Sequence, residues 1–439
     1  MTEITGVDAW EVLDSRGDPT VRVRVEAGNA SGTFTVPAGA STGAHEAVER
    51  RDGDDRYGGR GVRDACAAVR DDLAPAVEGR SVTDQVGVDE ALVDCDGTEA
   101  LSRLGANAVL GVSGAVAHAA ADATDRPLYA VLAPESGPGD LPIPMINVLS
   151  GGLHAAADLP IQDFLAVPVG AATYPEALEM VWDVRRAAGA RISVERHSTG
   201  NRTTSGDGAG DHPPSVADEG GFVPPVADAD AAFDYLVGAI RDAGYAPGDE
   251  VAIAVDVAAT HFYDADADRY DLAGETLDRE AMVDRVVDWV DTHPVHSVED
   301  PLAEDDWDGW ERLADRVGDR VQLLGDDLFA TNAGRLDRAV ESGAANAALI
   351  KPNQAGTITR TRRVLEATQD ADWAPVVSAR SGETCDATIA DLAVGLDAGQ
   401  IKIGSLARSE RLAKYNRLLG IDRAYDGGFA GSDALAPLD

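Results

Sequence analysis

Cysteine is scarce in this chain of 439 residues, and its few occurrences form no pattern that builds a site. The three cysteines, Cys66, Cys95 and Cys385, stand far apart. Zinc ribbons and disulfide frameworks need cysteines at short, regular spacings. We therefore interpret all of them as buried or incidental thiols.

Long hydrophobic runs are also missing. No apolar stretch reaches the roughly 18 residues of a membrane-spanning helix. Residues Met1–Thr5 offer neither a basic start nor an apolar continuation, which a secretory leader requires. The sequence therefore predicts a cytoplasmic protein that is neither secreted nor inserted in a membrane.

Positive charge is in short supply, with 37 basic residues against 77 acidic ones and a formal net charge of −40. A surface for nucleic acid or anionic lipid needs clustered Lys and Arg, so we expect neither as a partner. The acidic residues are spread along the chain rather than gathered in a tail. This composition is typical of proteins in concentrated salt, which screens the repulsion. We expect a halophilic archaeal cytoplasm as the source.

Lysine is almost absent, since only Lys351, Lys402 and Lys414 stand among the 37 basic residues. Arginine keeps its proton in a protein, whereas the pKa of lysine can be tuned until it gives the proton up. Lys351 and Lys402 are therefore candidates for a role that needs a deprotonable amine. Chance survival in a genome biased towards arginine is the alternative.

The first part of the chain has the pattern of a small sheet followed by helices. Two segments rich in β-branched residues, 20–26 and 32–36, are separated by Gly28–Ala30 and predict an antiparallel meander. Helices are expected over 64–77 and 106–123, the second rich in alanine and buried on several sides.

Two breaks in the pattern divide the chain. Residues 134–144 are rich in proline and glycine, which indicates a linker between domains. Residues 197–215 are rich in Gly, Ser and Thr, which predicts a mobile insertion.

After the second break, short apolar runs alternate with amphipathic stretches, as in parallel β/α units. Each run ends at a residue with a charged side chain. In a closed β/α barrel the carboxyl ends of the strands form one shared mouth, so we expect these side chains to converge. The residues are Asp256, Glu299, Asp326, Lys351, Arg380 and Lys402.

This set of residues predicts a specific chemistry. Asp256, Glu299 and Asp326 offer hard oxygen ligands, which suit Mg²⁺ better than zinc. Lys351 and Lys402 would lie across the same mouth, where a metal and a second cation favour the neutral amine. One of them can then act as a general base, while metal and cations stabilise the enolate. The sequence predicts removal of a proton next to a carboxylate.

Motifs along nearly the whole chain resemble those of enolase, phosphopyruvate hydratase, and they occur in the same order. The resemblance implies an α/β fold, with an N-terminal α+β capping domain over 1–134 and a C-terminal (β/α)8 TIM-like barrel over 142–439. It is carried by these segments: 11–20 (EVLDSRGDPT), 39–43 (GASTG), 104–108 (LGANA), 218–221 (DEGG), 297–301 (SVEDP), 325–328 (GDDL), 351–354 (KPNQ), 380–384 (RSGET) and 407–411 (ARSER).

The resemblance also implies roles for individual residues in converting 2-phosphoglycerate to phosphoenolpyruvate and water. Lys351 would be the base at C2, and Glu219 the acid that protonates the departing hydroxyl. Two Mg²⁺ ions per active site are implied, the tighter one held by Asp256, Glu299 and Asp326, and the second with help from Ser41. Substrate contacts are implied for Gln162, Arg380, Ser381, Lys402 and His154.

Two departures from the family pattern affect this site. Asp163 follows Gln162 where the family has a glutamate, so the carboxylate that would reach a hydroxyl or water is one methylene shorter. Ala379 replaces an active-site histidine. The catalytic set implied is therefore Glu219, Lys351, Asp163 and His154, with a remodelled surrounding.

The sequence is compatible with three hypotheses about the function. The first is an enolase, and the second a divergent paralogue that acts on a related phospho- or phosphono-carboxylate. The third is a non-catalytic protein with an enolase fold, against which the retained lysines argue. For the enzymatic readings the partner is a small phosphorylated carboxylate, and the resemblance implies a homodimer or a higher even homo-oligomer.

Overall fold

The computed structural model describes the chain apart from residues 1, 40–42, 156–158, 199–213 and 437–439. Ser41 and most of the predicted insertion at 197–215 lie outside the described residues. Within the described part, no helix is both long enough and apolar enough to cross a membrane.

The N-terminal region is an antiparallel sheet covered by helices. β1 (Gly6–Leu13), β2 (Pro19–Ala27) and β3 (Ala30–Thr35) pair in the order β1-β2-β3. The predicted meander is confirmed for β2 and β3, and β1 was not foreseen. Alternate residues of β2, such as Val21, Val23 and Val25, are fully buried, as expected for a sheet with one covered face.

The sheet is covered mainly by the alanine-rich helix α4 (Ala106–Thr124). Its close approach depends on Gly32, because a Cβ atom there would lie 2.1 Å from the carbonyl oxygen of Ala115. The helix expected over 64–77 is interrupted by a π-helical turn. The remaining helices of this region are η1 (Arg56–Gly59), α1 (Arg63–Ala68), η2 (Val69–Leu73), α2 (Ala74–Val77), α3 (Gln85–Asp96) and α5 (Leu128–Leu132).

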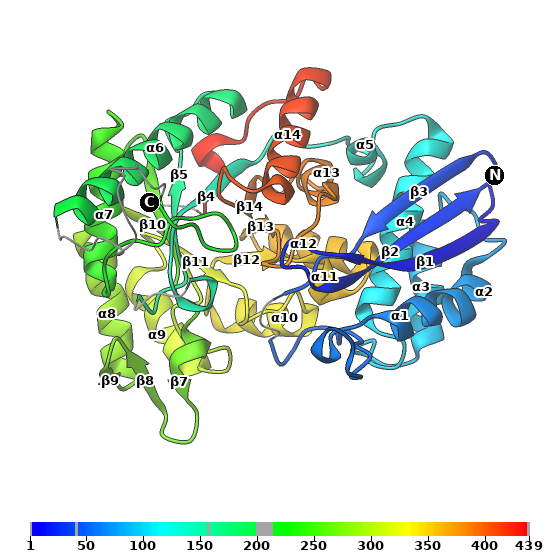
Figure 1. Ribbon diagram of the computed structural model, residues 1–439, viewed down its shortest axis with the longest axis horizontal. Helices are drawn as coiled ribbons and strands as arrows, with labels where there is room; N and C mark the ends of the chain where they lie inside the picture. Colours follow the sequence, from blue (N-terminus) through cyan, green and yellow to red (C-terminus); the bar gives the residue numbers. More distant parts are fainter. Residues whose placement is uncertain (1, 40–42, 156–158, 199–213, 437–439) are drawn as a thin grey trace, which may run out of the picture.

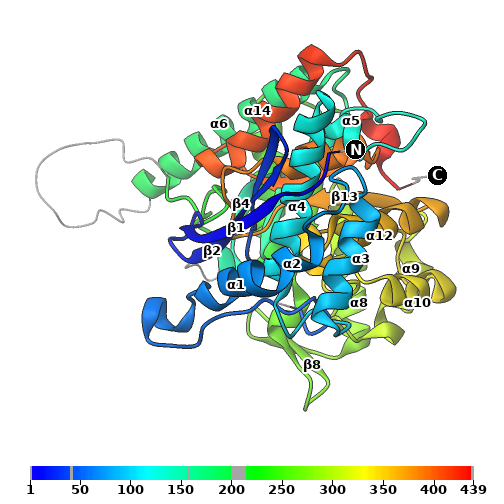
Figure 2. The same cartoon turned by 90° about the vertical axis from the view of Figure 1, so that its right-hand side faces the viewer.

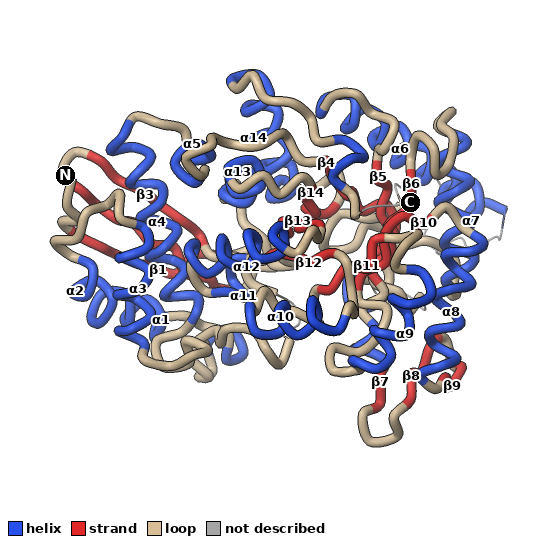
Figure 3. The backbone as a smooth tube through the Cα atoms, turned by 180° about the vertical axis from the view of Figure 1, so that it is seen from behind, coloured by secondary structure: helices blue, strands red, loops and turns tan. Residues whose placement is uncertain are grey.

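A closed barrel of eight strands makes up the rest of the core, and Figure 3 shows it surrounded by helices. Neighbours around the barrel follow the order β10-β11-β12-β13-β14-β4-β5-β6. The strands are β4 (Ile143–Ser150), β5 (Asp163–Val167), β6 (Ala252–Asp256), β10 (Val295–Glu299), β11 (Gln322–Gly325), β12 (Ala347–Ile350), β13 (Ala374–Ser378) and β14 (Gln400–Gly404).

The barrel departs from a regular (β/α)8 pattern at β5, which runs antiparallel to both β4 and β6. The connection from β4 to β5 contains the short 3-10 helix η3 (Gly152–His154), and the helices α6 (Tyr174–Ser198) and α7 (Ala229–Asp242) follow β5. Because β5 is reversed, its first residue lies at the end of the barrel where the parallel strands finish. Asp163 pairs there with Asp256, the last residue of β6.

Helices complete the outer layer of the barrel, as Figure 1 shows. They are α8 (Arg279–Thr292), α9 (Trp307–Val317), α10 (Ala333–Ser342), α11 (Pro352–Ala355), α12 (Ile358–Asp370), α13 (Thr388–Gly395) and α14 (Ser409–Ala424). Short 3-10 turns occur at η3 (Gly152–His154), η4 (Ala259–Phe262) and η5 (Gly431–Ala434). A small sheet that the sequence did not predict, β7 (Tyr263–Asp264), β8 (Arg269–Leu272) and β9 (Glu275–Leu277), projects from the barrel.

The N-terminal region contacts the barrel beside its mouth. Figure 2 shows α3 and α12 side by side, and the side chains of Asp89 and Ser113 accept hydrogen bonds from the first backbone N–H groups of α12. A two-way backbone bridge joins Ala38 to Gly382, just after β13. These contacts place Gly39, the first residue of the 39–43 motif, beside the residues that follow the strand ends.

Candidate active site

Five of the six predicted strand-end residues stand at or just beyond the end of a strand. Asp256 and Glu299 are the last residues of β6 and β10, and Asp326 and Lys351 directly follow β11 and β12. Arg380 lies two residues beyond β13. Lys402 differs, because it lies in the middle of β14, and its side chain reaches the same cavity from inside the barrel.

Lys402 lies between two of the predicted metal ligands. Its Nζ donates to Asp256 Oδ2 at 2.8 Å and to the two Glu299 oxygens at 2.7 and 2.6 Å. Burial alone would lower the pKa of Lys402, but the Asp256 and Glu299 carboxylates raise it well above its usual range. With these contacts the Lys402 amine keeps its proton; the neutral amine expected from the sequence required a metal ion beside it.

Lys351 pairs with Asp326 in the same cavity, through a short contact between Nζ and Oδ2. Gln354 Nε2 donates to the other oxygen of Asp326 at 3.1 Å. Burial would raise the pKa of Asp326, but the Lys351 cation lowers it below its usual range. Asp326 is therefore an ionised carboxylate, available to a cation.

The predicted ligands fall into two neighbouring acidic groups: Asp256 and Glu299 are joined through Lys402, and Asp326 lies with Asp300 and Asp327. Burial and the neighbouring Asp256 raise the pKa of Glu299 well above its usual range, so an added positive charge would stabilise its ionised form. Oxygens of Asp300, Asp326 and Asp327 lie within 4.8 Å of one another. The Asp300 oxygens already accept the backbone N–H groups of residues 326 and 327, which makes it a support for this loop.

Arg380 and Ser381 follow β13 and line the cavity. The Arg380 guanidinium is buried and bonds to both oxygens of Glu46, at 3.1 and 3.2 Å. Burial would lower the pKa of Arg380, but Glu46 raises it. Arg16 Nη1 donates to the Ser381 hydroxyl at 3.4 Å, so a residue of the N-terminal region also reaches this segment.

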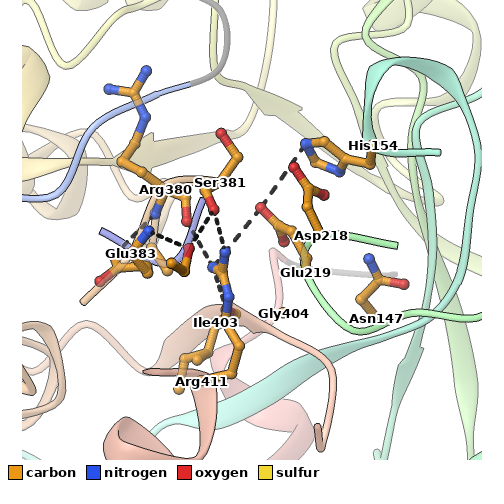
Figure 4. A network of polar contacts seen from close by, with 12 residues as sticks. Asn147, His154, Asp218, Glu219, Arg380, Ser381, Glu383, Ile403, Gly404 and Arg411 are labelled. Carbon is orange, nitrogen blue, oxygen red and sulfur yellow. Dashed lines mark hydrogen bonds and ion pairs between the residues drawn. The ribbon is translucent and has the colours of Figure 1, made fainter. Parts of the chain in front are cut away.

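Glu219, His154 and Asp163 form a chain of charges on the other side of the cavity, part of which Figure 4 shows. His154 Nδ1 lies 3.0 Å from Asp163 Oδ2, and His154 Nε2 lies 3.9 Å from Glu219 Oε1. Burial would lower the pKa of His154, but the two carboxylates raise it to about 10. His154 is therefore an imidazolium at neutral pH.

Asp163 stands behind His154 and is not among the described residues that line the cavity. It is completely buried, and its carboxylate bonds to Asn147, Ser150 and His154. The sequence suggested that this carboxylate reaches a hydroxyl or water of the reaction; in the structure its contacts orient His154 instead. Ala379, the second departure from the family pattern, does line the cavity.

Gln162 also reaches the cavity, where its Nε2 donates to Asp256 Oδ2 at 3.0 Å. The predicted residues that the structure describes line one cavity, except for Asp163, which lies behind His154, and Glu299, which bonds to Lys402.

Comparison with known proteins decides the family. The model of the enolase N-terminal domain matches residues 4–132, and that of the enolase C-terminal TIM barrel domain matches residues 139–437. An enolase from Acidothermus cellulolyticus is 48% identical over 429 residues, which cover 97% of this chain and 95% of that protein. The chain belongs to the enolase family.

Enolase resemblance on the sequence alone left two cavity residues, Glu46 and Asp327, and one buried neighbour of the cavity, Arg411, without a role. Glu46 contacts Arg380 although 334 positions separate them. The pKa of Asp327 rises to about 7 through burial and the nearby Asp326. Arg411 was noted only as part of the 407–411 motif. The one local signal was for Asp327 and Arg411, which fall inside family motifs.

Proposed function

We propose that this enzyme catalyses the reversible dehydration of 2-phospho-D-glycerate to phosphoenolpyruvate and water, a step of glycolysis and gluconeogenesis. The observation that carries the proposal is the meeting of two lysines and three acids in one cavity, in a chain of the enolase family. Proton removal next to a carboxylate needs a base and cations around the enolate, and this cavity supplies both.

We assign proton removal at C2 to Lys351. Its Nζ lies at the cavity wall and contacts Asp326. If Asp326 binds a metal cation instead, the Lys351 amine is released from this ion pair. Lys402 stays charged between Asp256 and Glu299 and would bind the substrate carboxylate, together with the Gln162 amide. A fixed cation there stabilises the charge that builds up in the transition state.

We assign Mg²⁺ as the cofactor, two ions per active site. Asp256, Glu299 and Asp326 would hold one, and Ser41, outside the described residues, would help hold the other. Bound Mg²⁺ would supply positive charge to the substrate carboxylate and the developing enolate. The buried carboxylates fit this use, because they are hard oxygen ligands whose mutual repulsion a divalent cation relieves.

The phosphate group would be bound by Arg380 and Ser381. A guanidinium matches a phosphate by paired hydrogen bonds, as it matches the Glu46 carboxylate here. Glu46 therefore occupies the position of an anion, and the substrate phosphate would replace it or share the guanidinium with it.

Loss of the hydroxyl would be assisted by Glu219 as acid, with His154 and Asp163 behind it. Burial would raise the pKa of Glu219, but Arg411 and His154 lower it below its usual range. In this arrangement His154 holds the proton nearest to Glu219, and Asp163 fixes the orientation of its ring. Glu219 is ionised in this arrangement, so it must gain a proton before it can act as the acid, and the negative charges of a bound substrate would raise its pKa and favour that uptake.

One observation favours a second candidate, a paralogue that acts on a related phospho- or phosphono-carboxylate. Ala379 lines the cavity where the family has a histidine, which leaves space for a different substituent.

Further properties are proposed with the function. We propose a cytoplasmic enzyme that divides into domains at 1–134 and 142–439, in line with the matched ranges of the two family models. We also propose a homodimer or a higher even assembly. A groove of about 490 Å³ between α6 and α14 is lined by the exposed side chains of Trp182 and Leu412, an apolar surface that a second copy would cover.

The direct test is the formation of phosphoenolpyruvate from 2-phosphoglycerate with Mg²⁺ in molar KCl. We expect turnover that excess chelator abolishes and that added Mg²⁺ restores. Full activity in chelator would contradict the metal assignment. Absence of turnover with 2-phosphoglycerate, together with turnover of a related phospho-carboxylate, would favour the paralogue.

A further inference from the structure

Helix α14 presents two buried cations to the underside of the active site. Arg411 and Lys414 are three residues apart, so they share a face of the helix, and their side chains are 0% and 1% exposed. Lys414 Nζ bonds to Glu383 Oε2 at 2.6 Å and to the carbonyl oxygens of Thr384 and Glu410. Lys414 thus supports the loop after β13 through a complete ion pair.

Arg411 makes different contacts. Its Nη1 donates to the carbonyl oxygens of Arg380 at 2.6 Å and Ile403 at 3.0 Å, and its Nη2 donates to that of Ser381 at 2.7 Å. One guanidinium therefore joins the segment after β13 to strand β14. Arg380 and Ser381, the two residues proposed to bind phosphate, are themselves held by Arg411 through their backbone carbonyl groups.

The same guanidinium also faces Glu219. Arg411 Nη1 lies 3.8 Å from Glu219 Oε1, and Figure 4 shows it between Glu219 and the Arg380–Glu383 segment. The nearest oxygen of its other acidic neighbour, Glu410, lies 4.0 Å from Nε. Removing a guanidinium from water costs several kcal/mol, which three neutral carbonyl groups offset only in part. A neutral amide could also donate hydrogen bonds to these carbonyl groups. The positive charge of Arg411 is therefore explained by its attraction to the Glu219 carboxylate.

We propose that Arg411 is a positioning residue, which holds the Glu219 carboxylate and the Arg380–Ser381 backbone at a fixed separation. This role rests on the proposed function. The substrate would then meet its phosphate contacts and its acid at once, with the hydroxyl opposite Glu219. Proton removal by Lys351 on the far side does not depend on that separation.

The test compares two rates in the full-length enzyme with 2-phosphoglycerate and Mg²⁺ in molar KCl. One is the formation of phosphoenolpyruvate, and the other is the exchange of the C2 proton with solvent deuterium. Arg411→Lys keeps the charge but cannot bridge three carbonyl groups, and Arg411→Gln removes the charge. Lys414→Met is the matched control, a second buried cation of the same helix that does not contact Glu219.

For both Arg411 variants we expect a higher KM and a loss of product formation on the order of 10²-fold, since a displacement of about 1 Å can cost that much. Exchange at saturating substrate should stay within a few-fold of the parent. Lys414→Met should lower the melting temperature and leave the ratio of the two rates unchanged.

Equal losses of exchange and product formation in the Arg411 variants, or the same change of ratio in Lys414→Met, would overturn the proposal. Failure of both Arg411 variants to fold, while Lys414→Met folds, would assign Arg411 to stability instead. A parent that forms no product from 2-phosphoglycerate would contradict the proposed function, and with it this role.

Discussion

Asp163 has no room for a longer side chain. Its carboxylate is fully buried and already bonds to Asn147, Ser150 and His154. An additional methylene in a filled site usually costs about 1–3 kcal/mol through displaced neighbours. The family's glutamate therefore cannot simply be restored here.

We accordingly predict that Asp163→Glu lowers the free energy of unfolding by about 1–3 kcal/mol and does not raise turnover. Denaturant titration measures the first effect, and kcat/KM for 2-phosphoglycerate measures the second. The same measurements on Ala379→His form the comparison, because residue 379 lines the cavity. A gain in kcat/KM from Asp163→Glu alone would show that this carboxylate reaches the substrate.

His154 makes stability depend on pH. Its pKa is about 10 in the folded protein, against about 6.5 for an unperturbed histidine, so between these values the folded protein keeps a proton that the unfolded chain loses. This contribution is complete below about pH 6.5 and is lost as the pH rises towards 10. Each unit of the shift corresponds to about 1.4 kcal/mol.

We predict that the free energy of unfolding falls less steeply between pH 6.5 and 10 in His154→Gln than in the parent. Asp163→Asn should move the fall to lower pH, because it removes a charge that raises the pKa of His154. Urea titrations at several pH values measure the slopes. Parallel slopes in all three proteins would contradict the charge state assigned to His154.

At the scale of single residues, the sequence predicts those that end strands and misses those that act from elsewhere. Asp256 and Glu299 follow apolar runs, so their position could be inferred from the run alone. Glu46 does not stand at the end of a strand, and its contact with Arg380 depends on how the N-terminal region lies on the barrel. No local pattern carries that information.

Helix α12 begins against the N-terminal region, not against solvent. Thr359 N donates to Asp89 Oδ2 at 2.8 Å, and Ile358 N donates to the Ser113 hydroxyl at 2.9 Å. The first N–H groups of a helix have no partner within it, so these side chains satisfy donors that would otherwise be buried unpaired. The two parts of the molecule are thereby joined by polar groups.

We predict that Asp89→Ala lowers the free energy of unfolding by about 1–3 kcal/mol, because a buried donor loses its acceptor. Glu90→Ala is the control on the same helix. Its pair with Arg363 is 3.6 Å long and exposed, and such pairs contribute about 0–1 kcal/mol. Equal losses in the two variants, measured by denaturant titration, would contradict the role given to Asp89.

At the scale of elements, the six parallel strands after the insertion were foreseen, whereas the reversal of β5 was not. A strand buried on both faces has the same run of apolar residues in either direction, so the pattern cannot show which way it runs. All five residues of β5 are buried. The reversal matters for function, because it brings Gln162 and Asp163 to the mouth.

The whole molecule carries 77 acidic and 37 basic residues, and their repulsion depends on salt. The Debye length grows from about 3 Å at 1 M to about 30 Å at 0.01 M, so low salt lets distant carboxylates repel one another. Exposed ion pairs such as Arg316–Asp284 gain at low salt, but each contributes about 0–1 kcal/mol at most. The unpaired excess of acid should dominate.

We predict that the melting temperature falls as KCl is reduced from molar concentrations to 0.01 M. Measurement at constant pH with chelator present separates this effect from metal binding. A melting temperature that stays constant across the range would refute the proposal that the enzyme is adapted to concentrated salt.

The central claim is that Lys351 removes the C2 proton and Glu219 assists the later loss of the hydroxyl, from opposite sides of one cavity. The most direct test follows C2 proton exchange with deuterium and phosphoenolpyruvate formation in Lys351→Ala and Glu219→Gln, with 2-phosphoglycerate and Mg²⁺ in molar KCl. We predict that Lys351→Ala abolishes both, and that Glu219→Gln blocks product formation while exchange continues. Normal exchange in Lys351→Ala would contradict the account and make Lys402 the first candidate for the base.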